Sequence, residues 1–120
     1  MSSQEQTANG VIKSSKSMDQ LLEIFIANGQ TARMAESAHY KTGRCIRVKH
    51  GEARITIEMC DSCTYLIHGE AGQPLELDAL CETTTKVLSS EKINHDIELY
   101  DDSALMYKKS FGDINNAPSA

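Results

Sequence analysis

A helical pattern of apolar positions begins just after the polar amino-terminal stretch. The spacing i, i+3, i+4, i+7, i+8, which places side chains on one face of an α-helix, is followed by Met18, Leu21, Leu22, Phe25 and Ile26. Ser17 and Gln20 have the spacing of a capping box, and Gly29 supplies a carboxy-terminal stop. The pattern therefore predicts a helix over residues 18–28.

Two alternatives stay open around this helix. A strand over residues 23–28 that turns at Asn28-Gly29 is the rival interpretation of the same sequence. The following segment, 30–40, fits either a further helical turn or an edge strand.

Two runs of residues then alternate between apolar and polar with the period of two that is typical of half-buried strands. The apolar positions are Ile46 and Val48 in the first run and Ala53, Ile55, Ile57 and Met59 in the second. His50-Gly51 between them predicts a two-residue turn, with Lys49 opposite Glu52. In that register the apolar residues share one face, and Arg47 lies opposite Arg54 on the outward face, which also carries Lys49.

A third strand and a second helix follow. Asp61-Ser62 predicts a turn, and residues 64–68 predict the strand after it. Pro74 is placed to open a helix. The apolar face of this helix is formed by Leu77, Leu80, Cys81, Thr84 and Leu88.

The chain closes with a second predicted hairpin, which turns at Asp101-Asp102. If Tyr100 lies opposite Ser103, one face of this hairpin is apolar and consists of Ile97, Leu99, Ala104 and Met106.

These elements predict an α+β fold, a mostly antiparallel sheet of about five strands with two helices on one face, in the order α-β-β-β-α-β-β. In this interpretation residues 17–111 form a single domain. Residues 1–16 are predicted to be a disordered polar arm and residues 112–120 a disordered tail, because both are polar and neither shows an apolar periodicity.

The composition limits the class of protein. The chain has 120 residues, a formal net charge of −5 and 24% charged residues, which is a globular composition. No apolar run reaches the roughly 18–20 residues needed to span a bilayer, and the first residues do not resemble a secretory signal. We therefore expect a soluble protein of the reducing cytoplasm, with free thiols and no cofactor.

One motif suggests thiol or metal chemistry. Cys60 and Cys63 form a CxxC, a spacing that can ligate zinc or exchange a disulfide, and Cys45 and His68 are candidate further ligands. A redox-active CxxC opens a helix that lowers the thiol pKa, whereas this one precedes a strand-like run. The competing interpretation is a tight turn flanked by two small apolar cysteines, so a thiol or zinc site is the alternative function.

No motif points to catalysis or to nucleotide binding. The chain contains no GxxxxGK[ST], GxGxxG or GxSxG sequence, and none of its four histidines forms a visible triad with an acid and a nucleophile. An enzyme whose site is assembled only in the fold is a third class, which would show a deep pocket joining a histidine to an acid.

Charge is distributed unevenly along the chain. Residues 33–57 carry six basic and two acidic side chains, a net charge of +4, whereas residues 58–102 carry eleven acidic and two basic ones, a net charge of −9. The functional interpretation is a basic patch for an acidic partner. The structural one is a set of solvated faces that neutralise each other within the fold or across a dimer. A nucleic-acid partner is not expected, because the overall charge is negative and few aromatic residues interleave the basic ones.

The basic residues define a candidate partner surface. The predicted register points three of them outward, and the neighbouring strand is expected to add two apolar side chains to the same outer face. A partly apolar outer face needs a cover, a second subunit or a client protein. The candidate partner-binding residues are therefore Arg44, Arg47, Lys49, Arg54, Tyr65 and Ile67.

The predicted element order resembles that of a known family. Over about Ser17 to Phe111, the order helix, three strands, helix, two strands is similar to that of the small acidic type III secretion chaperones, without a shared sequence motif and without that family's closing helix. The resemblance implies a dimer that holds an extended segment of another protein. We expect a non-catalytic protein-binding module (an adaptor, a chaperone, or an inhibitor or immunity-type protein) that uses a basic strand face or an open sheet edge.

Overall fold

The computed structural model describes residues 6–36, 43–71, 76–102 and 104–112. Their elements, in chain order, are β1 (Gln6–Lys13), α1 (Met18–Ala27), β2 (Thr31–Glu36), β3 (Arg44–His50), β4 (Ala53–Asp61), β5 (Thr64–Glu70), α2 (Leu77–Ser90), β6 (Asn94–Asp101) and β7 (Ala104–Phe111).

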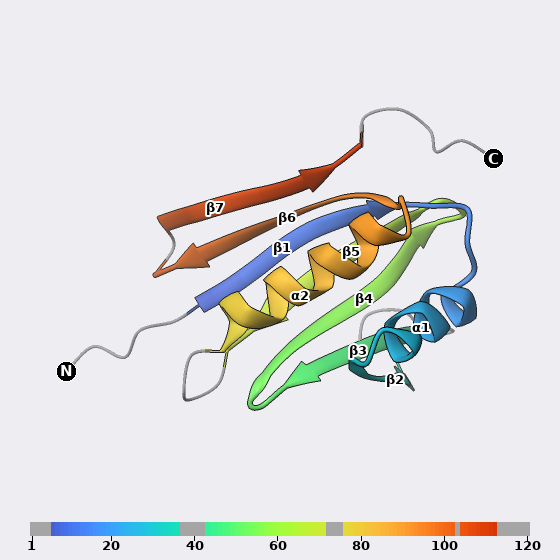
Figure 1. The fold of residues 1–120 in the computed structure, drawn as a ribbon, viewed down its shortest axis with the longest axis horizontal. Helices are drawn as coiled ribbons and strands as arrows, with labels where there is room; N and C mark the ends of the chain where they lie inside the picture. Colours follow the sequence, from blue (N-terminus) through green and yellow to red (C-terminus); the bar gives the residue numbers. More distant parts are fainter. Residues whose placement is uncertain (1–5, 37–42, 72–75, 103, 113–120) are drawn as a thin grey trace.

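The strands form one antiparallel sheet in the order β2-β3-β4-β5-β1-β6-β7, and both helices lie across the same face of it (Figure 1). The predicted α+β class and the two helices are confirmed. The prediction of about five strands is wrong, since the described residues form seven, and the chain opens with a strand where the sequence predicted a helix. The element order that resembles the secretion chaperones is therefore not the order of this fold.

The first strand corrects the prediction of a disordered arm. Residues 6–13 of that arm form β1, which lies between β5 and β6 near the middle of the sheet (Figure 1). Ala8 and Ile12 are fully buried under the helices. Gly10 lies where a Cβ would come within 2.2 Å of the Asp96 carbonyl oxygen, so the close approach of β6 requires a glycine. The predicted tail lies almost wholly outside the described residues.

The α1 prediction is confirmed in detail. The Ser17 hydroxyl accepts a hydrogen bond from the Gln20 backbone N–H, and the Gln20 side chain accepts one from the Ser17 N–H, at 3.1 and 2.8 Å. After the cap at Asn28, Gly29 takes a φ of +83°, where a residue with a side chain would be strained. The rival strand over 23–28 is wrong, and the described part of 30–40 contains the edge strand β2.

The β3–β4 hairpin has the predicted faces but a different register. Its turn is Gly51-Glu52, with His50 opposite Ala53, so Arg47 lies opposite Thr56 and Lys49 opposite Arg54. The predicted register was two residues away from this one, and a shift of two keeps every side chain on its face. The apolar residues therefore share the buried face as expected, whereas the predicted pairs of Lys49 with Glu52 and of Arg47 with Arg54 are wrong.

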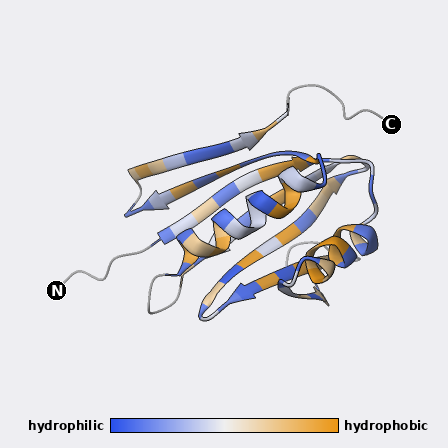
Figure 2. Cartoon of the chain, in the orientation of Figure 1, coloured by the Kyte–Doolittle hydropathy of each residue, from blue (hydrophilic) through white to orange (hydrophobic). Residues whose placement is uncertain are grey.

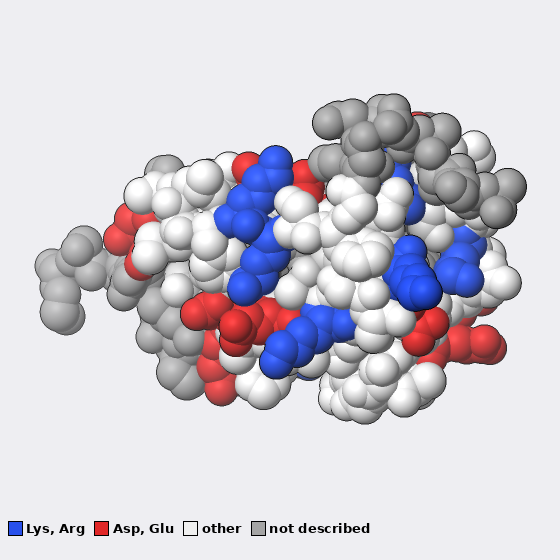
Figure 3. Space-filling view, turned by 45° about the horizontal axis from the view of Figure 1, so that its top comes forward, with Lys and Arg blue, Asp and Glu red and all other residues white. Residues whose placement is uncertain are grey.

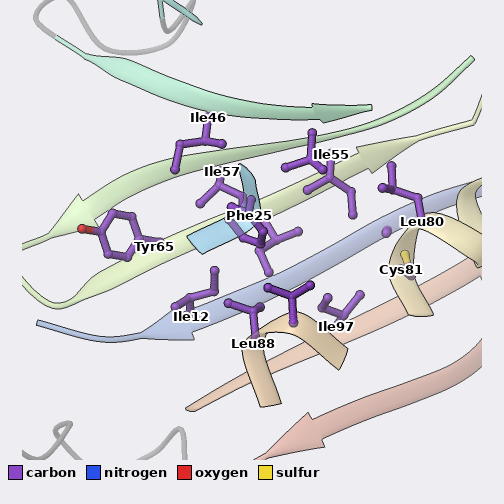
Figure 4. Close-up of a cluster of buried hydrophobic side chains, with 14 of the residues drawn as sticks. Ile12, Phe25, Ile46, Ile55, Ile57, Tyr65, Leu80, Cys81, Leu88 and Ile97 are labelled. Carbon is purple, nitrogen blue, oxygen red and sulfur yellow. The ribbon is translucent and has the colours of Figure 1, made fainter. Parts of the chain in front are cut away.

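The core lies between the sheet and the two helices (Figure 4). Along β4 the hydropathy alternates from residue to residue, which is the pattern of a strand buried on one side only (Figure 2). The predicted face of α2 is confirmed, because all five of its residues are buried. Pro74, the residue predicted to open this helix, lies outside the described residues.

The last hairpin departs from its predicted register. A bulge between Leu99 and Tyr100 places Leu99 opposite Tyr107 and Tyr100 opposite Leu105. Ile97 and Leu99 are buried as predicted, but Ala104 and Met106 are exposed. Tyr107 packs against the core in their place, and its hydroxyl donates to Asp78 Oδ1 of α2 at 2.5 Å.

Candidate partner-binding surface

The sheet has a second face, opposite the helices, over which no described element passes; we call it the open face. The alternation of each strand decides which side chains reach it. Because Ile46, Val48, Ile55 and Ile57 are buried against the helices, the residues between them on β3 and β4 point to the open face. On the three strands at the β2 end of the sheet, the cations of this face are Arg33, Arg47, Lys49 and Arg54.

These four residues, which we call the basic cluster, are brought together by the strand register. Arg33 of β2 lies opposite Arg47 of β3, and Lys49 of β3 lies opposite Arg54 of β4. Residues opposite each other on one face of an antiparallel pair have their Cβ atoms about 4.5–5.5 Å apart, and like charges at such positions are destabilising. The basic cluster thus contains two unfavourable cross-strand pairs on neighbouring ladders.

Only one member of the basic cluster is neutralised within the described chain. Arg54 donates from Nε and Nη2 to Glu70 Oε2, at 3.3 and 3.1 Å, and these hydrogen bonds lower the pKa of the Glu70 carboxyl. For Arg33, Arg47 and Lys49, no described carboxylate oxygen lies within 4.0 Å. The Nε atom of Arg47 is buried and has no hydrogen-bond partner among the described residues.

The two lysines of the edge strand β7, in contrast, have nearby acids. Lys108 lies 3.6 Å from Asp96, and Lys109 lies 3.9 Å from Glu82 while also covering the Tyr107 ring. On the face that includes the β7 edge, basic and acidic side chains accordingly lie side by side (Figure 3). The two lysines of β7 are therefore neutralised, whereas three of the four cations of the basic cluster have no described acid within 4.0 Å.

Three of the six predicted partner-binding residues do not belong to this surface. Arg44 is exposed but has the helix-side alternation of β3, and its Nη2 lies 3.7 Å from Asp19 of α1. Tyr65 and Ile67 are buried in the core on the helix side, at 0% and 3% exposure. The prediction that Tyr65 and Ile67 lie on the outer face is therefore wrong.

A bulge explains this reversal. The pairing of β4 with β5 shifts between Met59 and Asp61, so Met59 lies opposite Tyr65 and Ile57 opposite Ile67. An extra residue on one strand changes the register by one position, which moves every following side chain to the other face. Leu66, which is 40% exposed, and His68 take the open-face positions on β5 instead.

Arg33 is the site residue that the sequence analysis missed. It belongs to the basic stretch of residues 33–57, but the sequence leaves segment 30–40 open between a helical turn and an edge strand, so it assigns Arg33 to no face. The pattern that could have placed Arg33 is the alternation of residues 31–36, in which Ala32 and Met34 are half-buried. Had these residues been predicted to form a strand, Arg33 would have been placed on the face opposite them.

The structure does not gather the proposed thiol or metal ligands into one site. Cys60 is exposed within the β4 bulge, Cys63 is half-buried in the following turn, and Cys45 is buried on β3. Within the residues that the structure describes, no group of three or more His, Cys, Asp or Glu side chains converges on a position that could hold a metal ion. Asp61 Oδ1 accepts the Cys63 N–H at 3.0 Å, a turn contact that lowers the pKa of the Asp61 carboxyl.

Comparison of the chain with models of known protein families and with curated protein sequences gives no match. Among the described residues, no helix is both long enough and apolar enough to cross a membrane.

Proposed function

We propose that this chain is a non-catalytic protein-binding module that captures an acidic partner through the basic cluster on its open face. The observation that carries this proposal is the pair Arg33 and Arg47, two guanidinium groups opposite each other with no described carboxylate within 4.0 Å. The proposed binding residues are Arg47, Lys49 and Arg54, which the sequence predicts, together with Arg33.

The free protein keeps a repulsion between opposed cations, and an acidic partner would relieve it. Like charges opposite each other weaken a ladder by an amount comparable to the roughly 0.2–1 kcal/mol of a favourable pair. Carboxylates brought by a partner turn these repulsive pairs into charge-assisted hydrogen bonds. Positive potential concentrated at one end of the sheet also raises the rate of encounter with an acidic molecule.

A protein partner fits this surface better than a nucleic acid. The chain has a net charge of −5, which opposes a long polyanion. Glu58 and Glu70 stand on the same open face as the basic cluster, so the positive region is short. Stacking platforms for bases are also scarce, because aromatic residues make up only 5% of the chain.

A cytoplasmic location is part of the proposal, because the four cysteines are unpaired in the structure and suit a reducing compartment. The homodimer stays a prediction, and neither catalysis nor a cofactor is proposed.

Charge reversal tests this function. The probe is a fluorescently labelled oligoglutamate peptide of about ten residues, whose binding is followed by anisotropy at low salt and at about 0.15 M salt. We expect the double variant Arg47→Glu, Lys49→Glu to weaken binding by at least about tenfold, roughly 1.4 kcal/mol. The matched control is Lys86→Glu, Lys92→Glu, which makes the same change in net charge at exposed residues of α2 and the turn after it.

The control is expected to stay within about twofold of the unchanged protein, since general charge effects are small compared with local contacts. Equal losses in the two double variants would show that binding follows net charge alone and would overturn the proposal. So would the absence of binding by the unchanged protein even at low salt.

A further inference from the structure

We propose that the acidic partner binds as an extended segment that adds an eighth strand to the sheet at the β2 edge. This inference rests on the proposed function and specifies its geometry. β2 is the last strand on its side of the sheet, so among the described residues its outer backbone groups have no ladder partner. Strand addition at such an edge supplies main-chain hydrogen bonds, while alternate side chains provide specificity.

The alternation of hydrogen-bonded pairs, counted from the β3–β4 turn, shows which residues of β2 direct their backbone N–H and C=O groups toward the free edge. The two-residue turn at Gly51-Glu52, in which Gly51 has a φ of +60°, makes His50 and Ala53 a hydrogen-bonded pair. Hydrogen-bonded pairs alternate along each ladder. The backbone groups of Lys49 and Arg47 therefore point away from β4, toward β2.

The same alternation then continues into β2. Lys49 lies opposite Thr31 and Arg47 opposite Arg33, so these residues of β2 use their N–H and C=O groups in the β2–β3 ladder. The groups directed toward the free edge are those of Ala32 and Met34. These two amides are the donors that an added strand would meet.

The side chains around this edge define the kind of segment that fits. A residue of the added strand opposite Arg33 would lie on the open face, about 4.7–4.9 Å from β2 and about twice that distance from β3 and Arg47. Its neighbours in sequence would lie on the helix side beside Ala32 and Met34, which are half-buried against the core. On that side α1 packs on β2 and carries Ile26, 53% exposed. A segment that fits this edge therefore has carboxylates on the open face, alternating with apolar residues on the helix side.

A second copy of this chain does not satisfy the edge. Paired residues of an antiparallel ladder lie on the same face, so a two-fold β2–β2 contact would bring two basic clusters together. The other edge, β7, offers Lys108 and Lys109 and no acid of its own. Neither edge strand of a second copy thus carries a carboxylate on its open face, and we assign the carboxylates to another protein.

The β7 edge is also a poorer site for an acidic segment. Its lysines lie near Asp96 and Glu82, so an incoming carboxylate would have to displace acids already present. The basic cluster beside β2 needs no such exchange, because three of its four cations have no described acid within 4.0 Å.

Hydrogen exchange with a designed peptide tests this geometry. The probe is an acetylated and amidated peptide of alternating Glu and Val, about as long as the 6 residues of β2. The control peptide has Gln in place of Glu. At low salt we expect the Glu peptide to bind at least about tenfold more tightly. At saturation, the Ala32 and Met34 amides of the full chain should exchange at least about tenfold more slowly, because they gain ladder partners.

The outcomes separate this inference from the proposed function. If the peptide binds and the Arg47→Glu, Lys49→Glu variant loses it, but the Ala32 and Met34 amides are not slowed, the proposed function stands and strand addition is overturned. Slowing at β7 in place of β2 also overturns it, as does equal binding of the Gln peptide. If a thymidine oligonucleotide displaces the Glu peptide at equal charge concentration, the partner is a nucleic acid and both proposals fail.

Discussion

Arg33 lies directly opposite Arg47 on the open face of the β2–β3 ladder. The cation on the open face of the other edge strand, β7, has acidic neighbours instead. Lys108 of the edge strand β7 lies opposite Glu98 and 3.6 Å from Asp96. The sheet therefore neutralises its cation at the β7 edge and keeps a repulsion at the β2 edge, where we place the partner.

The repulsion predicts that Arg33→Thr stabilises the protein. Removing one charge of an opposed pair should raise the free energy of unfolding by about 0.2–1 kcal/mol, and threonine suits an edge strand. The same substitution at Lys108 should lower that free energy by up to about 1 kcal/mol, because it removes the cation beside the nearly buried Asp96 carboxylate. Urea unfolding of both variants measures the two signs. A loss of stability in Arg33→Thr would show that this arginine has a stabilising partner.

The central position of β1 predicts a large effect of Gly10→Ala. A Cβ at this position would meet the Asp96 carbonyl oxygen at 2.2 Å, and backbone cannot move aside as a flexible side chain can. We expect the free energy of unfolding to fall by about 1–3 kcal/mol, as for other overpacked sites. Asn9→Ala is the control, since Asn9 is exposed on the same strand. Equal stability of the two variants in urea would contradict the placement of β1.

Local signals in the sequence predicted local structure. The Ser17 and Gln20 cap, the amphipathic spacing of α1 and the alternation of β3 and β4 depend on neighbours within a few residues, and all three are confirmed. β1 was missed because its sequence is polar and contains glycine. It is ordered by pairing with β5 and β6, which lie far away in the chain.

Turn and bulge details decided the rest of the site. Tyr65 was placed on the wrong face because one extra residue in β4 is enough to exchange the faces, and that residue has no distinct sequence pattern. The predicted register of the β3–β4 hairpin was wrong by two residues, but an even shift keeps each side chain on its predicted face. The basic cluster could therefore be predicted in part, through Arg47, Lys49 and Arg54.

The buried His95 predicts a loss of stability in mild acid. Its Nδ1–H donates to the Ile93 carbonyl at 2.8 Å, which leaves Nε2 to accept from the Thr85 hydroxyl at 2.5 Å. This arrangement satisfies the neutral ring. Desolvation accordingly lowers the pKa of His95 below its ordinary value of 6.5, although the Ile93 carbonyl and the nearby Asp96 oppose that shift.

A histidine whose pKa is lowered by folding binds more protons in the unfolded state, so its protonation favours unfolding. Its contribution to stability should be constant above about pH 7.5 and should fall as the pH drops below the unfolded pKa. NMR titration of the His95 ring, with urea unfolding at about pH 7.5 and about pH 5.5, measures both quantities. A His95 pKa above the ordinary value of 6.5 would contradict the account.

The Tyr107 hydroxyl connects the β7 edge to α2, and its removal should loosen that edge. Tyr107→Phe deletes the hydrogen bond to Asp78, which should lower the free energy of unfolding by about 0.5–1.5 kcal/mol. Tyr100→Phe is the control, because among the described residues the Tyr100 hydroxyl bonds within its own strand, to Glu98. Faster amide exchange in β7 should accompany Tyr107→Phe and not Tyr100→Phe. The reverse pattern would show that this contact does not hold β7.

The most direct measurement for the basic cluster is a charge exchange between the protein and its ligand. In the variant Arg33→Glu, Arg47→Glu, the alternating Glu and Val peptide should bind at least about tenfold less tightly than to the unchanged protein. A peptide of alternating Lys and Val, which the unchanged protein should reject, should bind the variant instead, because the complementary charges are restored in the opposite sense. If both proteins prefer the same peptide, or if the variant binds neither, the open face at β2–β4 does not recognise an acidic partner by its charge.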